Sequence, residues 1–330
     1  MEKRYDVAAI GNAIVDVIQP AGDKFLLEHK IAKGVMTLID EFRAMHLVSA
    51  LSGATESSGG SAANTMAGLA SLGASGHFTG KVKNDRLGQS FAADLRRNGI
   101  VFETRMAEDG PATAFCVIAV TPDGQRSMNT YLGACRELRP GDIDARAIAA
   151  ASVLYIEGYL WDAEGAKAAI RKAIAVAKGA GSKVAFTLSD PFCVGRFRDE
   201  FLELMRDDVD ILFANEEEAK SLYEMESFDG ALQEARAWKG LAVLTRSEKG
   251  CVIAAENGEV HVLDAEKTRV IDTTGAGDAF AAGFLHGCAR GFNLRASGRL
   301  GAIAAAEVIS HYGARPEKSL KSLAAKAGLG

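Results

Sequence analysis

The sequence has few of the features that mark secreted, disulfide-bonded or metal-cluster proteins. Its 330 residues contain five cysteines, none in a CxxC pair or at a metal-binding spacing. An odd number of widely spaced cysteines is typical of reduced thiols. The first residues also lack the apolar core and cleavage site of a secretory signal. We therefore expect a cytoplasmic protein.

Long apolar runs and a charge excess of one sign are also missing. No apolar stretch reaches the roughly 18 residues of a membrane-spanning helix. Lys and Arg total 38 and Asp and Glu total 43, and the positive charges are scattered. This distribution argues against a surface for nucleic acid or membranes. Without repeats or proline-rich linkers, residues 1–330 are expected to form one domain that binds small molecules.

Strand-like and helix-like patterns alternate through most of the chain. The strand-like segments are 5–11, 76–82, 152–158, 183–189, 210–215 and 241–246. The helix-like segments are 61–73, 85–99, 163–180, 197–206, 216–224, 229–238, 277–290 and 296–311. The strands are rich in Val, Ile, Leu and Phe, as in strands buried on both faces. The pattern predicts an α/β fold in which helices cover both faces of a mostly parallel sheet.

Two regions interrupt this alternation. Residues 12–40 hold strand-like pieces without a proper helix between them. Residues 112–133 hold two strand-like arms around Pro122-Asp123-Gly124, a hairpin signal. We interpret both regions as a small β-sheet lid inserted into the main domain. Another hairpin is predicted over 250–264, with its turn at Asn257-Gly258.

The segment VIDTTGAGDAF combines an acid with a glycine-rich turn. Residues 267–272 are strand-like and a helix follows, so Thr274–Gly277 is the predicted strand-to-helix turn. A helix N-terminus attracts anions, and glycines let a phosphate approach the backbone. A bound phosphate would repel Asp278, whereas a phosphoryl-transfer site gains a proton acceptor for the attacking hydroxyl. The alternative is that Asp278 only complements the helix dipole. A dinucleotide fingerprint is disfavoured because Phe280 occupies its third glycine position.

Three segments offer groups that could hold a sugar and a base. The glycine-rich helix entry at 57–64 could bind a sugar, or it could be a flexible turn capped by Ser61. Asp16 interrupts an apolar run, where its carboxylate needs the donors that a ribose diol supplies, or faces water on an edge strand. Tyr159 follows a strand, where it could stack on a base or belong to the core.

Three other segments could hold a nucleotide. Asn215 and Glu218 begin the helix after a strand, where they serve Mg²⁺ and its waters or simply cap the helix. Arg126, near the lid hairpin, could reach a phosphate, although most such arginines lie on the surface. The turn at 245–250 could line the nucleotide.

The conjunction of these motifs resembles the PfkB or ribokinase family of carbohydrate kinases. SGGSAAN, NEEE and DTTGAGDAF occur in that order and spacing, and the resemblance covers essentially the whole chain. It implies a ribokinase-like three-layer α/β/α sandwich with a β-sheet lid. It also implies MgATP as the donor and transfer of its γ-phosphoryl group to a primary hydroxyl.

The resemblance also implies a role for each matching residue. Asp278 would be the catalytic base. The anion hole would be formed by Gly275, Ala276 and Gly277, and the acceptor would contact Gly59, Gly60, Ser61 and Asn64. ATP would contact Arg126, Asn215, Thr245 and Gly250. Glu218 would hold Mg²⁺ through water, and Asp272 with Thr274 would hold K⁺.

Within the family, the chain most resembles the adenosine kinase branch. GNAIVDVI resembles the Gly-Asn-x-x-x-Asp element of that branch, which carries ribose binding to Asn12 and Asp16, and Tyr159 is a candidate to stack on the base. The resemblance implies a monomer that phosphorylates the 5′-hydroxyl of adenosine. The alternatives are a kinase of ribose, fructose or 2-keto-3-deoxygluconate, and a non-catalytic nucleotide sensor.

Overall fold

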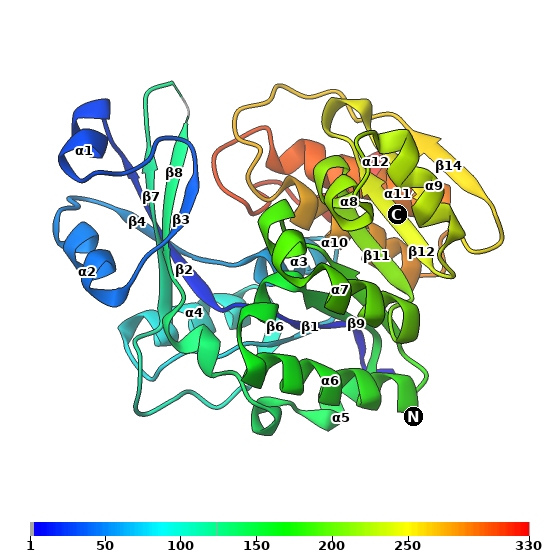
Figure 1. The fold of residues 1–330 in the computed structure, drawn as a ribbon, viewed down its shortest axis with the longest axis horizontal. Helices are drawn as coiled ribbons and strands as arrows, with labels where there is room; N and C mark the ends of the chain where they lie inside the picture. Colours follow the sequence, from blue (N-terminus) through cyan, green and yellow to red (C-terminus); the bar gives the residue numbers. More distant parts are fainter. Residues whose placement is uncertain (1–2, 124, 330) are drawn as a thin grey trace.

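The computed structural model describes residues 3–123 and 125–329 and divides them between a main body and a lid (Figure 1). A nine-stranded sheet forms the centre of the main body, and a five-stranded sheet forms the lid. The predicted mostly parallel sheet with a smaller β-sheet beside it is therefore confirmed. Among the described residues, no helix combines the length and apolarity needed to cross a membrane.

Neighbouring strands of the large sheet run parallel from β6 to β12, and a final antiparallel hairpin completes it. From edge to edge the strands are β6 (Ile100–Phe102), β5 (Gly76–Thr79), β1 (Tyr5–Ile10), β9 (Ala151–Glu157), β10 (Lys183–Thr187), β11 (Ile211–Asn215), β12 (Leu241–Thr245), β13 (Cys251–Ala254) and β14 (Val260–Leu263). The central strands are buried on both faces, as their apolar sequences predict. The carboxyl ends of the parallel strands therefore share one edge of the sheet.

Helices cover both faces of this sheet. One layer contains α3 (Ser61–Ser71), α4 (Arg86–Arg97), α10 (Ala276–Ala289) and α11 (Leu294–Val308). The other contains α5 (Ala145–Ala149), α6 (Glu164–Gly179), α7 (Pro191–Asp207), α8 (Glu216–Tyr223) and α9 (Phe228–Ala237). Small apolar residues at helical spacing in α6, such as Ala166, Ile170 and Ala173, turn one stripe of that helix toward the sheet. α12 (Leu320–Lys326) packs outside α11.

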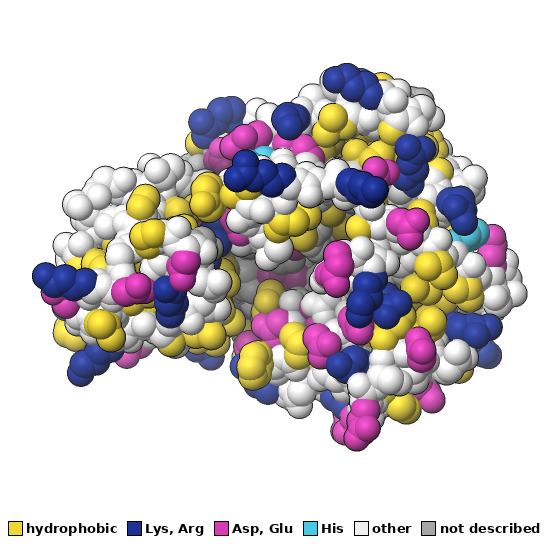
Figure 2. Space-filling view, turned by 90° about the horizontal axis from the view of Figure 1, so that it is seen from above, with side chains coloured by type: hydrophobic (Ala, Val, Ile, Leu, Met, Phe, Trp, Pro, Cys, Tyr) yellow, Lys and Arg dark blue, Asp and Glu magenta, His cyan; other side chains and the backbone are white. Residues whose placement is uncertain are grey.

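The lid sheet has the strand order β3-β8-β7-β2-β4. Its elements are β2 (Ile14–Pro20), α1 (Asp23–Glu28), β3 (Met36–Leu38), α2 (Glu41–Ser49), β4 (Thr55–Gly59), β7 (Ala114–Val120) and β8 (Arg126–Tyr131). Leu26 of α1 and Leu47 of α2 are buried against this sheet. Figure 2 shows the surface hollowed between the lid and the main body. We call this hollow the cleft.

The lid differs from its predicted extent. The region 12–40 is not purely strand-like, because Asp23–Glu28 forms α1, and the lid continues beyond it through α2 and β4. β4 has the polar sequence TESSG, which carries no apolar alternation; it is a strand because it pairs with β2. The hairpin at 112–133 is confirmed as β7 and β8. Gly124, predicted in its turn, lies outside the described residues.

The prediction of a strand over 267–272 is wrong. The segment is an extended connection in which Val270 is 59% exposed, and Ile271 bonds through its amide to the carbonyl of Ile309. The β13–β14 hairpin already occupies the edge of the sheet, so this segment has no neighbouring strand with which to pair. β6 and α12 were not expected. α7 begins at Pro191 and is kinked at Phe197, so the helix predicted near 197–206 is its second part.

Candidate active site

Asp278 lies in the first turn of α10, beside the N-terminus of α3. Its carboxylate accepts hydrogen bonds from the Ser61 hydroxyl at 2.6 Å and from the Asn64 amide at 3.2 Å. Burial raises the pKa of Asp278 to about 6, and the two hydrogen bonds limit that rise. Residues predicted from two separate motifs therefore meet at one carboxylate. With its pKa close to neutrality, this group is suited to accept a proton.

The turn before Asp278 has the backbone geometry of an anion site. Gly275 caps α10 in the left-handed conformation, with φ of +75°, and a side chain there would overlap Ala314. Ala276 and Gly277 begin the helix, where amides have no partner within it. A Cβ atom on Gly277 would meet nothing within 4 Å, so its backbone is open to a ligand. The predicted anion hole thus has a suitable conformation, although no strand leads into it.

The two glycines before α3 are required by close contacts that are not visible in the sequence. A Cβ atom on Gly59 would overlap the carboxylate of Asp16, and one on Gly60, where φ is +93°, would overlap the carbonyl of Asn12. The sequence predicts that these glycines let a sugar approach the backbone. In the structure, these glycines first allow β4 and β2 to bring the Asp16 carboxylate against the entry of α3.

Asp16 is half-buried in β2, and its carboxylate accepts no hydrogen bond from any described residue. Burial raises its pKa to about 6; the positive charges of Arg126 and Arg315 lower it, and the negative charge of Asp278 raises it. Asp16 and Asp278 are therefore close enough to interact electrostatically. A half-buried carboxylate without donors is costly, and a ligand that carries hydroxyl groups would satisfy it.

Glu157, at the end of β9, was not predicted. It is fully buried, and its two oxygens accept the amides of Asn12 at 2.7 Å and Ala62 at 2.8 Å. Burial raises its pKa to about 7. Glu157 thus fixes the exit of β1 toward the lid and the first turn of α3. An acid at the end of an apolar strand, in YIEG, was the signal that could have identified it.

Arg315, in the segment YGARPEK near the end of the chain, was not singled out either. Its Nη1 donates to Asp94 at 2.6 Å and its Nε to the side-chain oxygen of Asn64 at 3.4 Å. Because the Asn64 oxygen faces Arg315, its NH₂ group faces Asp278. Asp94 also accepts the hydroxyl of Ser58, in lid strand β4. A continuous chain of hydrogen bonds therefore runs from the lid to Asp278.

The predicted nucleotide residues lie at the carboxyl ends of β11 and β12. Asn215 and Glu218 form a reciprocal cap of α8, in which the Asn215 side chain accepts the Glu218 amide at 2.9 Å and donates to its carboxylate at 2.6 Å. Thr245 pairs with Asn215 in the sheet. Gly250 has φ of +82°, and a side chain there would overlap the backbone of Leu263, so the β13 turn alone explains this glycine.

Glu218 is buried close to other acids. Burial raises its pKa to about 7, and the negative charges of Asp190 and Asp278 raise it further against the opposing Asn215 amide. Asp190 caps α7 by accepting the Cys193 amide at 2.6 Å. The negative charges of these three carboxylates would attract a cation, and carboxylate oxygens suit Mg²⁺ held through water. The residues present therefore fit the predicted metal, and the Glu218 assignment remains a prediction.

Tyr159 lies on the main body near these acids. Its hydroxyl donates to the carbonyl of Ser189 at 3.2 Å, and burial together with Asp190 raises its pKa far above the usual range. Its ring packs against the core between the sheet and α5–α9. The core alternative thus accounts for this aromatic residue, and its role in base stacking stays untested.

Arg126, the first residue of β8, forms a buried ion pair with Asp272 between the lid and the main body. Asp272 also accepts the Gly313 amide at 2.9 Å and the Thr274 hydroxyl at 2.7 Å. Burial would raise the pKa of Asp272, but these hydrogen bonds and Arg126 lower it. All its partners are hydrogen donors, so K⁺ at this carboxylate would have to displace one. The K⁺ site remains a prediction, as does a contact of Arg126 with phosphate.

Known proteins match both the motifs and the fold. The pfkB family carbohydrate kinase model matches residues 38–320. A solved adenosine kinase from Sinorhizobium meliloti is 50% identical, covering 98% of this chain and 99% of that chain, with a TM-score of 0.92. A probable sugar kinase protein from Rhizobium etli is 48% identical, covering 99% of both chains, with a TM-score of 0.93.

A curated relative extends the match to another substrate. The 5-dehydro-2-deoxygluconokinase of Shouchella clausii is 27% identical over 320 residues, which cover 94% of this chain and 91% of that protein. The printed names thus include both a nucleoside and sugars as acceptors, but all are kinases. Together with the fold and the Asp278 turn, they show an ATP-dependent phosphotransferase. The chain belongs to the pfkB family of carbohydrate kinases.

Proposed function

We propose that this protein is a nucleoside kinase that transfers the γ-phosphoryl group of ATP to the 5′-hydroxyl of adenosine, giving AMP and ADP. The observation that carries the proposal is a pair of carboxylates at the cleft. Asp16, on the lid, has no donor from the described protein residues, and Asp278, on the main body, stands at an anion-binding helix N-terminus. One suits a sugar diol and the other suits the hydroxyl that is phosphorylated. The 50% identity to the S. meliloti adenosine kinase supports adenosine as the acceptor.

The ribose would bind between Asp16 and the N-terminus of α3. The Asp16 carboxylate would accept hydrogen bonds from the 2′- and 3′-hydroxyls, which would satisfy its missing donors. The Asn64 amide, oriented by Arg315, donates to Asp278, and the charges of Arg315 and Asp278 both act on the Asp16 carboxylate. A ribose held at both ends would direct its 5′-hydroxyl toward Asp278, and such positioning removes much of the entropic barrier to reaction.

The chemical step would transfer one proton and one phosphoryl group. Asp278 would accept the 5′-hydroxyl proton while the oxygen attacks the γ-phosphorus and the bond to the leaving ADP oxygen breaks. The hydroxyl of Ser61, now 2.6 Å from Asp278, would have to give up that position to the substrate hydroxyl. Amides of Gly275–Gly277 would stabilise the charge on the transferring group. When bound near Glu218, Mg²⁺ would supply further neutralisation of the phosphates.

The base would lie against the lid. Lid strand β3 leaves Met36 41% exposed and Leu38 46% exposed. A phosphorylated sugar would instead favour several basic side chains on the lid strands, and β3 supplies none. These apolar groups suit the flat face of a purine, and lid closure over it would keep water from the γ-phosphate.

The test is the release of ADP from MgATP with adenosine, inosine, ribose, fructose, fructose 6-phosphate and 2-keto-3-deoxygluconate at equal concentrations. We expect rapid turnover with adenosine and little with the free sugars. Turnover with a sugar and none with adenosine would replace the acceptor and keep the phosphotransferase. The names of the R. etli and S. clausii relatives make a sugar the second candidate. The absence of ADP release with every acceptor would contradict the nucleoside proposal.

A further inference from the structure

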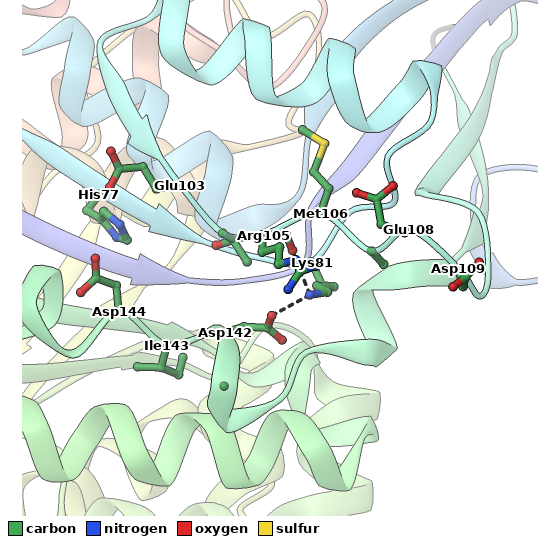
Figure 3. Close-up of a pocket in the computed structure, with 13 residues that line it drawn as sticks. His77, Lys81, Glu103, Arg105, Met106, Glu108, Asp109, Asp142, Ile143 and Asp144 are labelled. Carbon is green, nitrogen blue, oxygen red and sulfur yellow. Dashed lines mark hydrogen bonds and ion pairs between the residues drawn. The ribbon is translucent and has the colours of Figure 1, made fainter.

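A cavity outside the cleft contains a buried histidine without a partner. The cavity has a volume of about 610 Å³ and lies between the β5–β6 edge of the large sheet and the start of α5 (Figure 3). His77, in β5, is only 1% exposed, and neither ring nitrogen has a hydrogen-bond partner among the described residues. Buried polar groups are almost always paired, so this imidazole calls for an explanation.

Two carboxylates face the same ring. Glu103 follows β6, and Asp144 caps the N-terminus of α5. One ligand atom from each of the three residues lies within 4.8 Å of the other two. Figure 3 shows the His77 imidazole between the two carboxylates. No metal-binding pattern is visible in the sequence here, because 26 and 41 residues separate the three positions. Only the pairing of β5 with β6 and the approach of α5 bring them together.

The nearby positive charges do not neutralise these acids. Lys81, in the same cavity, is directed at Asp142 at 2.6 Å and at the carbonyl of Arg105 at 2.9 Å. Neither Glu103 nor Asp144 forms an ion pair within the described part of the chain. Asp144 uses one carboxylate oxygen to cap α5, through the amides of residues 146 and 147, and leaves the other oxygen for a ligand.

We propose that His77, Glu103 and Asp144 form a binding site for a divalent transition-metal ion such as Zn²⁺, with water completing the coordination. One imidazole nitrogen and two carboxylate oxygens are ligands that Zn²⁺ takes, whereas Mg²⁺ and Ca²⁺ prefer oxygen alone. The bound ion would tie β5, the segment after β6 and α5 together on the α5–α6 side of the sheet. Its role would be structural and separate from the kinase reaction.

Isothermal titration of chelator-treated protein with Zn²⁺ tests this site. We expect one equivalent to bind in the presence of excess Mg²⁺ and to raise the melting temperature, because it binds the folded state. Glu103→Gln and Asp144→Asn should each weaken binding by about tenfold or more. Both variants should fold, since Glu103 is exposed and asparagine also caps helices well. Asp109→Asn removes an acid that lines the same cavity outside the cluster, and it should leave binding unchanged.

Substitution with Co²⁺ gives a second, spectroscopic readout. Visible d–d bands should be present in the wild-type protein and absent in the Glu103→Gln/Asp144→Asn double variant. Zn²⁺ binding that survives this double variant would overturn the proposal. So would binding that is lost in Glu218→Gln instead, since the ion would then occupy the cleft. Failure of the wild-type protein to bind Zn²⁺ would overturn it as well.

Discussion

The lid and the main body are both sheets covered by helices, but they bury their strands to different extents. Every residue of β5 is buried and nearly all of β9. In the lid, β7 is buried to the same extent, but β2 alternates and β3 is fully exposed. The large sheet has helices on both faces, and the lid is covered by α1 and α2. Full burial gives the main body a fixed geometry for Asp278. Partial burial leaves the lid with open surface for a ligand.

The two regions also hold their acids differently. The Asp278 carboxylate accepts hydrogen bonds from Ser61 and Asn64, whereas the Asp16 carboxylate accepts none from the described part of the chain. The difference suggests a division of labour in which the main body performs the chemistry and the lid recognises the acceptor. Four substitutions test this comparison.

The largest effect is expected for Asp278→Asn. Loss of the proton acceptor should lower kcat by about 10²–10⁴-fold, while adenosine still binds. The same change should stabilise the fold at neutral pH, because the pKa of Asp278 is raised from 3.8 to about 6, which costs the folded state up to about 3 kcal/mol. This gain should vanish below the unfolded pKa, grow as the pH rises to about 6 and stay constant above it.

Steady-state kinetics and denaturant unfolding across this pH range measure both effects. Asp229→Asn, which alters an exposed acid in the first turn of α9, is the matched control and should change neither. Normal turnover of Asp278→Asn would contradict the assignment of the base.

The buried pair between the lid and the main body should give the next largest effect. Asp272→Asn leaves Arg126 as an uncompensated buried cation and should lower the free energy of unfolding by about 3 kcal/mol. Arg126→Met combined with it should recover part of the loss. Because the pKa of Asp272 is lowered on folding, its contribution to stability is fully present above the unfolded pKa and should be lost as the pH falls from there through the lower pKa of the folded state.

Glu56→Gln is the control for this pair. It breaks the exposed pair with Arg86, which also links the lid to the main body, and should cost less than about 1 kcal/mol. Equal losses in Asp272→Asn and Glu56→Gln would show that burial does not distinguish the two contacts.

Asp16→Asn tests the lid side of the comparison. Loss of the charged acceptor for the ribose diol should raise KM for adenosine by about 10- to 100-fold, with a smaller change in kcat. Asp40→Asn, an exposed lid acid that caps α2 and whose replacement keeps the cap, should have no effect. A fall in kcat with unchanged KM would assign Asp16 to the chemistry rather than to recognition.

The smallest effect is expected for Arg315→Met. Removing its charge should raise the pKa of Asp16, which Arg315 now lowers, and release the Asn64 amide that faces Asp278. Both carboxylates would ionise at higher pH, so the acidic limb of the kcat/KM profile should move upward by less than about one pH unit. Arg315→Lys should restore much of the profile. An unshifted profile in Arg315→Met would exclude this positioning role.

The accuracy with which the sequence predicted strands differed from one strand to another. Apolar strands such as β1 and β9 were identified because burial on both faces leaves a continuous apolar run. β4 was not, since its polar residues make a strand only by pairing with β2. The segment 267–272 failed in the opposite way: its pattern was strand-like, but no strand lies beside it. Local propensity thus predicts strands only where the sheet supplies a partner.

The candidate site shows the same limit. Asp278, Asn64 and Asp16 were found because each stands in a short motif with a glycine or an apolar neighbour. Arg315 and Glu157 were missed because their importance lies in which groups they contact, Asn64 and Asp94 for one and two backbone amides for the other. A single sequence carries no direct signal of such distant contacts.

The sequence by itself determined the main alternation of strands and helices, the acid at a glycine-rich helix entry, and the family. Burial periodicity and turn chemistry are local properties, so they can be read from neighbouring residues. Only the tertiary structure decided that Gly59 and Gly60 make room for Asp16 and Asn12, and that His77 meets two acids. These juxtapositions join residues from separate strands, and their geometry exists only once the sheet has brought those strands together.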